Sequence, residues 1–196
     1  MNIFFTADCH FSHDNIRKHC NRPWSNINDH DQGLIENWNK TVGRKDTTYI
    51  LGDFAMIKKS NDGIPPMKKY RKIIHALNGK KILIIGNHDS MNQETYACFT
   101  KVYDGIRDMT IDRQKITLCH YPMRSWNCSF HGAWHFFGHV HGRTPEQDGM
   151  LSCDVGVDVP EWNYTPVSWD QLKAKFAIKK TKWLDYWNKN DKSWKV

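Results

Sequence analysis

Residues 82–89 read Ile-Leu-Ile-Ile-Gly-Asn-His-Asp, a short apolar run that ends in a cluster of polar side chains. The apolar part has the length and composition of a β-strand that is buried on both faces. An amide, an imidazole and a carboxylate follow directly after Gly86. The segment therefore predicts a buried strand that presents reactive groups at its carboxyl end.

The same arrangement recurs along the chain. Apolar runs end in polar residues at 3–7 before Asp8 and His10, at 49–51 before Asp53, at 116–119 before His120, and at 134–137 before His139 and His141. Between these runs, apolar residues spaced by three and four predict helices over 34–42 and 67–77, and a last helix is expected to begin near Ser168. Strands that alternate with helices indicate a layered α/β domain. Because ligands of open α/β sheets bind at the carboxyl ends of strands, we expect the polar groups to share one crevice.

The chain of 196 residues contains no internal repeat and no break in composition. We expect a single domain over residues 1–196, with the catalytic frame in 3–160 and a basic, aromatic helix and strand in 165–196. Lysines and tryptophans alternate in the last segment. Such a pattern fits single-stranded nucleic acid binding, but it equally describes a solvated helix face followed by an edge strand that buries its tryptophans. The second interpretation is favoured, because charge runs are usually solvated.

The formal net charge is +7, which suggests an anionic partner without identifying one. Six scattered cysteines show no C-x-x-C pair and fit free thiols in a reducing compartment. Cys9 and Cys119 each neighbour a candidate site residue, and on a strand they would face the other way as packed thiols. Nothing in the sequence resembles a targeting signal or a membrane span, so we expect a soluble, cytoplasmic protein without a membrane partner.

The candidate site residues offer carboxylate, imidazole and amide groups and require no thiolate. Such a set suits Mn, Fe, Co, Ni or Zn rather than a cysteine-rich structural zinc site. In an extended strand, alternate side chains point the same way. Asp8 and His10 would therefore reach one site together, as would His139 and His141.

In chain order the motifs are D-x-H, G-D, G-N-H-D, H and G-H-x-H, and together they resemble the calcineurin-like metallophosphoesterase superfamily over Asp8–His141. The opening D-x-H-F-x-H is similar to the compact bacterial and phage branch. The resemblance implies a four-layer αββα sandwich of two mixed β-sheets flanked by helices. It also implies two divalent metal ions, one held by Asp8, His10, Asp53 and His141 and the other by Asp53, Asn87, His120 and His139.

The resemblance further implies hydrolysis of phosphate esters by a hydroxide that bridges the two metals. His88 would stabilise the transition state or protonate the leaving alkoxide, and Asp89 would orient His88 through a hydrogen bond. We expect manganese to support activity in vitro, with iron, nickel, cobalt and zinc as alternatives.

Substrate contacts are less clearly indicated. By analogy with the compact branch, His13 either touches a substrate phosphate or has a capping or packing role for the following helix. Arg124 and Arg143 follow motif segments and could bind a second phosphate or a leaving group, and Trp126 could stack on a base. All three could equally be decoration at the rim of the site, and that interpretation is somewhat favoured.

Three functions follow from these expectations. The first is a phosphoesterase of small, nucleotide-like substrates, with diesters slightly preferred. The second is a nuclease or RNA-end-processing phosphatase that uses the same site, for which activity on oligonucleotides should fall steeply with salt. The third is a non-catalytic interaction scaffold, which predicts no metal-dependent hydrolysis. The oligomeric state and the physiological substrate are not indicated by the sequence.

Overall fold

A computed structural model describes residues 1–57, 63–89, 92–145 and 149–190. Its first sheet has five strands in the order β4-β3-β2-β1-β9. The neighbours from β4 to β1 run parallel, and β9 pairs antiparallel with β1. The bounds are β1 Ile3–Thr6, β2 Thr47–Leu51, β3 Lys80–Ile84, β4 Lys101–Tyr103 and β9 Val167–Ser168.

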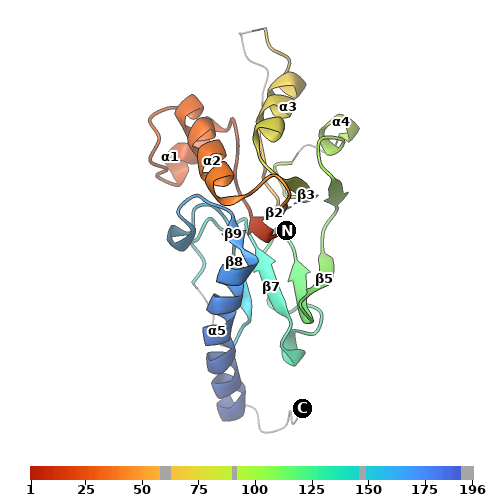
Figure 1. The fold of residues 1–196 in the computed structure, drawn as a ribbon. Helices are drawn as coiled ribbons and strands as arrows, with labels where there is room; N and C mark the ends of the chain where they lie inside the picture. Colours follow the sequence, from red (N-terminus) through yellow and green to blue (C-terminus); the bar gives the residue numbers. More distant parts are fainter. Residues whose placement is uncertain (58–62, 90–91, 146–148, 191–196) are drawn as a thin grey trace.

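The second sheet has four strands in the order β5-β6-β7-β8. Strands β5 and β6 are antiparallel, and the other two pairs are parallel. The bounds are β5 Arg107–Ile111, β6 Gln114–Leu118, β7 Trp134–Phe137 and β8 Ser152–Asp154. A parallel bridge between Ala7 and Gly156 connects the two sheets just beyond β1 and β8. The predicted pair of mixed sheets flanked by helices is confirmed (Figure 1).

Five α-helices surround the sheets in the described residues: α1 Asp14–His19, α2 Ile27–Thr41, α3 Pro66–Ala76, α4 Gln93–Tyr96 and α5 Trp169–Asn190. Short 3-10 helices cover Ser129–His131 and Pro160–Trp162. Helix α2 begins where the Asn26 side chain accepts hydrogen bonds from the amides of Asn28 and Asp29. Helix α3 begins at Pro66, a position where a backbone N–H would have no intrahelical acceptor, so proline costs no hydrogen bond there.

Adjacent residues of the first sheet face two different cores. Phe4 and Leu83 pack with α2 and α3 on one side of the sheet, whereas Phe5 and Ile84 pack toward the second sheet on the other. This alternation follows from the pleat of a strand and explains why the runs are apolar without interruption. The sheet is thereby fixed between two layers, and its loops at the carboxyl ends of the strands are held in place.

Helix α5 packs on the core between the two sheets, the one that contains Phe5 and Ile84, and then extends past the body of the molecule (Figure 1). The ring of Phe176 stacks on Trp134 with centroids 4.2 Å apart, and Trp183 is half-buried against the same core. The chain remains helical from Trp169 to Asn190, so the strand predicted to follow the helix does not begin before that residue. The rest of that prediction, including Trp194, lies outside the described residues.

Among the helices that the described ranges contain, none combines the length and the apolar character that crossing a bilayer requires.

Candidate metal centre

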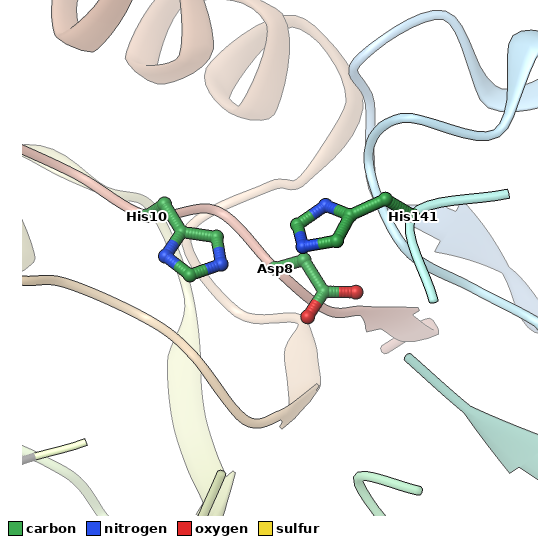
Figure 2. A group of neighbouring side chains, drawn as sticks. All are labelled: Asp8, His10 and His141. Carbon is green, nitrogen blue, oxygen red and sulfur yellow. The ribbon is translucent and has the colours of Figure 1, made fainter. Parts of the chain in front are cut away.

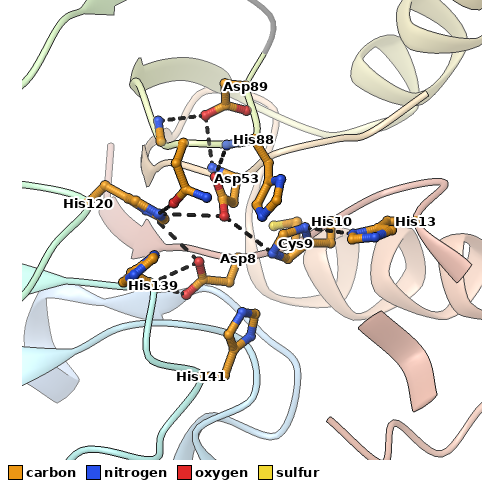
Figure 3. Close-up of polar contacts among 12 residues, drawn as sticks. Asp8, Cys9, His10, His13, Asp53, His88, Asp89, His120, His139 and His141 are labelled. Atoms are coloured by element: carbon orange, nitrogen blue, oxygen red, sulfur yellow. Dashed lines mark hydrogen bonds and ion pairs between the residues drawn. The ribbon is translucent and has the colours of Figure 1, made fainter. Parts of the chain in front are cut away.

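The loops that follow β1, β2, β3, β6 and β7 bring the predicted polar groups together (Figure 3). The predicted extended geometry of these segments is wrong. Asp8, His10, Asp53, His139 and His141 have left-handed backbone φ angles of 58°, 51°, 54°, 71° and 51°. Left-handed φ is uncommon outside glycine and is stabilised by the surrounding structure, often at functional sites. Sharp local turns, and not strand alternation, therefore aim these side chains.

The first group consists of Asp8, His10 and His141, which point toward one another in Figure 2. One potential ligand atom from each residue lies within 4.8 Å of the others. The Nε2 atom of His10 is buried and has no hydrogen-bond partner among the described residues. Burial, with Arg22 and neighbouring histidines adding to it, lowers the pKa of His10 to about 2, so the ring is neutral. A buried imidazole nitrogen without a partner is costly, and a cation would satisfy it.

The second group consists of Asp53, His120 and His139. His120 Nδ1 lies 2.8 Å from the Leu51 carbonyl oxygen, which can only accept, so the proton of the neutral ring is on Nδ1. Burial lowers the pKa of His120 and keeps the ring neutral. Its Nε2 lone pair then faces the Asn87 Oδ1 at 2.9 Å. Two acceptors that face each other indicate a cation between them, and the carbonyl behind the ring fixes the tautomer.

Asp53 belongs to the second group and also lies beside His10 of the first group. Its Oδ2 is 3.4 Å from His10 Nε2 and 3.5 Å from His120 Nε2. Ligand atoms that each lie roughly 2.0–2.2 Å from a common metal have mutual spacings of this size. Asp8 and Asp53 are 0% and 2% exposed, and buried carboxylates require charge compensation. The donor set therefore fits two cations that share the Asp53 carboxylate.

Asp89 does not orient His88, and that prediction is wrong. The buried Asp89 carboxylate accepts hydrogen bonds of 2.8 Å from three backbone amides, those of Asp53, Phe54 and Gly86. The loop after β3 is thereby joined to the loop after β2. Gly86 permits this approach, because a Cβ there would lie 2.6 Å from the Asp53 amide nitrogen. Asp89 therefore acts as a clamp between two loops of the site.

His88 and His13 lie at the open side of the first group. The backbone N–H of His88 donates to Asp53 Oδ1 at 2.8 Å, and its exposed ring is 5.4 Å from the His10 ring. His13 precedes α1, yet its side chain makes no capping hydrogen bond. Its Nδ1 is instead 3.2 Å from His10 Nδ1, and its ring is 6.0 Å from that of His88. The geometry places His13 at the candidate site and argues against the capping alternative.

The three other candidates at the rim have different surroundings. Trp126 is buried and donates from Nε1 to the Ala133 carbonyl, so it is not a stacking platform. Arg143 donates from Nη2 to the His19 carbonyl at 2.7 Å, which ties its guanidinium to the end of α1. Arg124 is exposed and lines a cavity beside the loop after His141. Of the two arginines, Arg124 is the one placed to meet a ligand.

Cys9 and Cys119 are buried, which agrees with the prediction of packed thiols. Burial raises the pKa of Cys9 to about 12, so this thiol is neutral beside the site.

A buried network behind His141 was not predicted from the sequence. Asp158 Oδ2 is 2.7 Å from His141 Nδ1, and Arg22 forms two hydrogen bonds of 2.7 and 2.8 Å to the same carboxylate. Arg22 also donates to the carbonyls of Asp8 and Cys9. Burial would lower the pKa of His141, but the Asp158 hydrogen bond raises it to about 10, so the metal-free ring is protonated and has to release its Nε2 proton to bind a metal. Asp158 thus fixes the orientation of one candidate ligand, while Arg22 holds the loop that carries another.

We expect Asp158→Ala to destabilise the fold by about 3–5 kcal/mol, because it leaves the buried guanidinium of Arg22 without its carboxylate. The two side chains are 0% and 4% exposed. Asp14→Ala is the matched control, since Asp14 pairs with Arg17 at the surface and is 46% exposed, and it should cost no more than about 1 kcal/mol. Urea unfolding of the two variants measures both free energies. Equal losses would show that the buried pair has no special role.

Comparisons with known proteins place the chain among relatives of similar length. The uncharacterized protein MJ1445 of Methanocaldococcus jannaschii is 34% identical over 173 residues, which cover 87% of this chain and 88% of that protein. The chain belongs to the same family as this archaeal protein. No family model matches the sequence.

Among solved structures, the protein of unknown function AQ665 from Aquifex aeolicus has a TM-score of 0.69 at 26% identity, with 89% of this chain and 98% of that chain covered. The two chains therefore share a fold. A weaker likeness is to YfcE, a phosphoesterase from E. coli, with a TM-score of 0.45 at 16% identity over 80% of this chain and 79% of that one. A likeness this weak does not establish an activity, which has to be argued from the residues of the site.

Proposed function

We propose that this chain is a metal-dependent phosphoesterase that uses two divalent cations and hydrolyses nucleotide-like phosphate esters, with diesters slightly preferred. The observation that carries the proposal is the Asp53 carboxylate, whose Oδ2 lies 3.4 and 3.5 Å from imidazole nitrogens of two separate groups. In this proposal one cation is held by Asp8, His10, Asp53 and His141. The other is held by Asp53, Asn87, His120 and His139.

The chemistry of the donor set supports this choice. All proposed ligand atoms are oxygen or imidazole nitrogen, which suits manganese and the later first-row metals. Two divalent cations carry four positive charges, of which Asp8 and Asp53 offset two, so the centre retains an attraction for an anionic phosphate. When bound, such metals neutralise charge that develops on phosphate oxygens and lower the pKa of water.

The remaining tasks fall to side chains at the open side of the centre. We propose that the His88 imidazole donates a ring N–H proton to the leaving oxygen of the ester or stabilises the charge of the transition state. The hydrogen bond from the His88 backbone N–H to Asp53 fixes the position of the backbone that carries the ring. His13 lies beside it and can donate a hydrogen bond to a phosphate oxygen. Asp89 holds the loop that carries Asn87 and His88.

The exposure of the site supports a diester substrate. Asn87, His88 and His139 are exposed, whereas Asp8, His10 and Asp53 are buried beneath them. A second ester group on phosphorus can therefore project into solvent or along the surface of the protein. A closed pocket shaped around a terminal phosphate would instead favour monoesters.

The proposal is tested by removing and restoring the metal. Chelator-treated protein should show no turnover, and Mn²⁺ should restore hydrolysis of bis-p-nitrophenyl phosphate ahead of p-nitrophenyl phosphate. Cyclic nucleotides in the same panel would then narrow the substrate class. Absence of turnover with Mn²⁺, Ni²⁺, Co²⁺ and Zn²⁺ would contradict the proposal and favour the scaffold interpretation.

A further inference from the structure

Two cavities of about 640 and 580 Å³ adjoin each other on the side of the molecule that carries α5. Both are lined by Met150, Glu161 and Lys175, so the two cavities adjoin at these residues, and together they are called the groove. The larger cavity follows a single face of α5, to which Gln171, Ala174, Lys175, Ile178, Lys179 and Lys182 contribute. Their spacing of three and four residues is that of one helix face.

The smaller cavity lies beside two loops that carry candidate ligands, and none of the candidate ligands themselves lines it. Pro122, Met123 and Arg124 line it and follow His120 in the chain. Gly142, which directly follows His141, lines it as well and donates its N–H to Asp154. One end of the groove therefore lies next to the loops that carry His120 and His141, and the other end lies along α5.

The charge along the groove is predominantly positive. Arg124, Lys175, Lys179 and Lys182 line it, against Asp154 and Glu161. Asp154 accepts from the backbone amides of Gly142 and Gly156, and Glu161 is ion-paired with Lys175. Because Lys175 is paired with Glu161, the extent of the basic lining is set by Arg124 in the smaller cavity and Lys182 in the larger one, which is longer than one phosphate group. A chain of phosphates fits this spacing better than a single phosphate.

We infer that the groove binds the backbone of a single-stranded nucleic acid whose reacting phosphodiester lies at the metal centre. This inference rests on the proposed phosphoesterase function and specifies its substrate class. The groove also presents apolar surface from the half-buried Met150 and from Ile178, which is 66% exposed. Only a single strand exposes its base faces to such surface, whereas a duplex hides them in stacked pairs. An acidic protein partner would match the charge alone.

Binding is tested without catalysis, on chelator-treated protein and a fluorescent single-stranded oligonucleotide, by anisotropy at several salt concentrations. Lys179→Gln with Lys182→Gln should weaken binding about 10-fold at low salt and reduce the slope of log Kd against log salt by about 1.4, which is the loss of two phosphate contacts. Lys68→Gln with Lys72→Gln is the matched control, because these lysines are exposed on α3, which lies at the opposite end of the molecule (Figure 1). The control should leave the slope unchanged.

An unchanged slope in the groove variant would overturn the inference, as would an equal loss in the α3 control. Binding of a duplex as tight as that of the single strand would also overturn it, and so would no binding of the oligonucleotide by the wild-type protein. Turnover of bis-p-nitrophenyl phosphate by metal-restored protein separates the two proposals. If that small diester is hydrolysed equally by wild type and groove variant while oligonucleotide binding fails, only the groove assignment is wrong.

Discussion

Asp53→Asn is expected to deplete both metal positions and to lower kcat/KM by about 10³-fold or more. The substitution keeps the size of the side chain and removes the negative charge that the two proposed sites share. A loss of about 4 kcal/mol of charge stabilisation corresponds to that factor. Asp53 Oδ2 lies 3.4 Å from His10 Nε2 and 3.5 Å from His120 Nε2, so both metal positions should lose affinity.

Metal content after dialysis, measured together with turnover, checks this prediction. Asp104→Asn serves as the control, because it removes the same charge from the chain at an exposed position in the loop between β4 and β5. Thermal unfolding of both variants without metal separates a lost ligand from a lost fold. A folded Asp53→Asn variant that retains two metal ions would contradict the shared role of this carboxylate.

His88→Ala is expected to keep its metal and lose turnover by about 10²–10⁴-fold, the usual contribution of a general acid. The His88 ring is exposed at the open side of the centre, and the interaction that ties the residue to Asp53 comes from its backbone N–H. That hydrogen bond survives truncation of the side chain. Metal content and kcat with a diester whose leaving oxygen is a basic alkoxide, such as a cyclic nucleotide, are the measurements, and His75→Ala, on the exposed face of α3, is the control.

The identity of the leaving group distinguishes the two roles proposed for His88. A proton donor matters most when the leaving oxygen is a basic alkoxide, and least for nitrophenolate, which departs without help. Equal losses for esters with good and poor leaving groups would instead indicate stabilisation of charge on the phosphate. Wild-type turnover by the variant on both substrates would remove His88 from the mechanism.

The main strands and helices could be predicted from the sequence because their patterns are local. The runs at 3–7 and 82–85 contain no polar interruption, and the helix ends carry recognisable signals such as Pro66. The short strands β4, β8 and β9 were not predicted, because a strand of two or three residues is too short to show the alternation of apolar and polar residues. The turn between β5 and β6 places Asp112 and Arg113 at φ angles of 47° and 67°. Glycine is the usual second residue of such a turn, so the Asp-Arg pair did not predict it.

At the site, the sequence indicated which residues converge but not how they do so. The alternation rule assumed extended backbone, whereas Asp8 and His141 adopt left-handed φ angles that only the folded loops impose. Asp89 was assigned to its sequence neighbour His88, yet its carboxylate holds the amides of a loop 36 residues away. Arg22 and Asp158 are separated by 136 residues, and no local pattern pairs them. Contacts of this kind are set by tertiary packing.

The central claim is that Asp53 joins two metal positions into one catalytic centre. Titration of metal-free protein with Mn²⁺, with bound metal and turnover of bis-p-nitrophenyl phosphate followed in the same samples, tests it most directly. We predict that binding saturates at two metal ions per chain and that turnover reaches its plateau only as the second position fills. Saturation of both binding and turnover at one ion per chain, or hydrolysis without metal, would contradict the account.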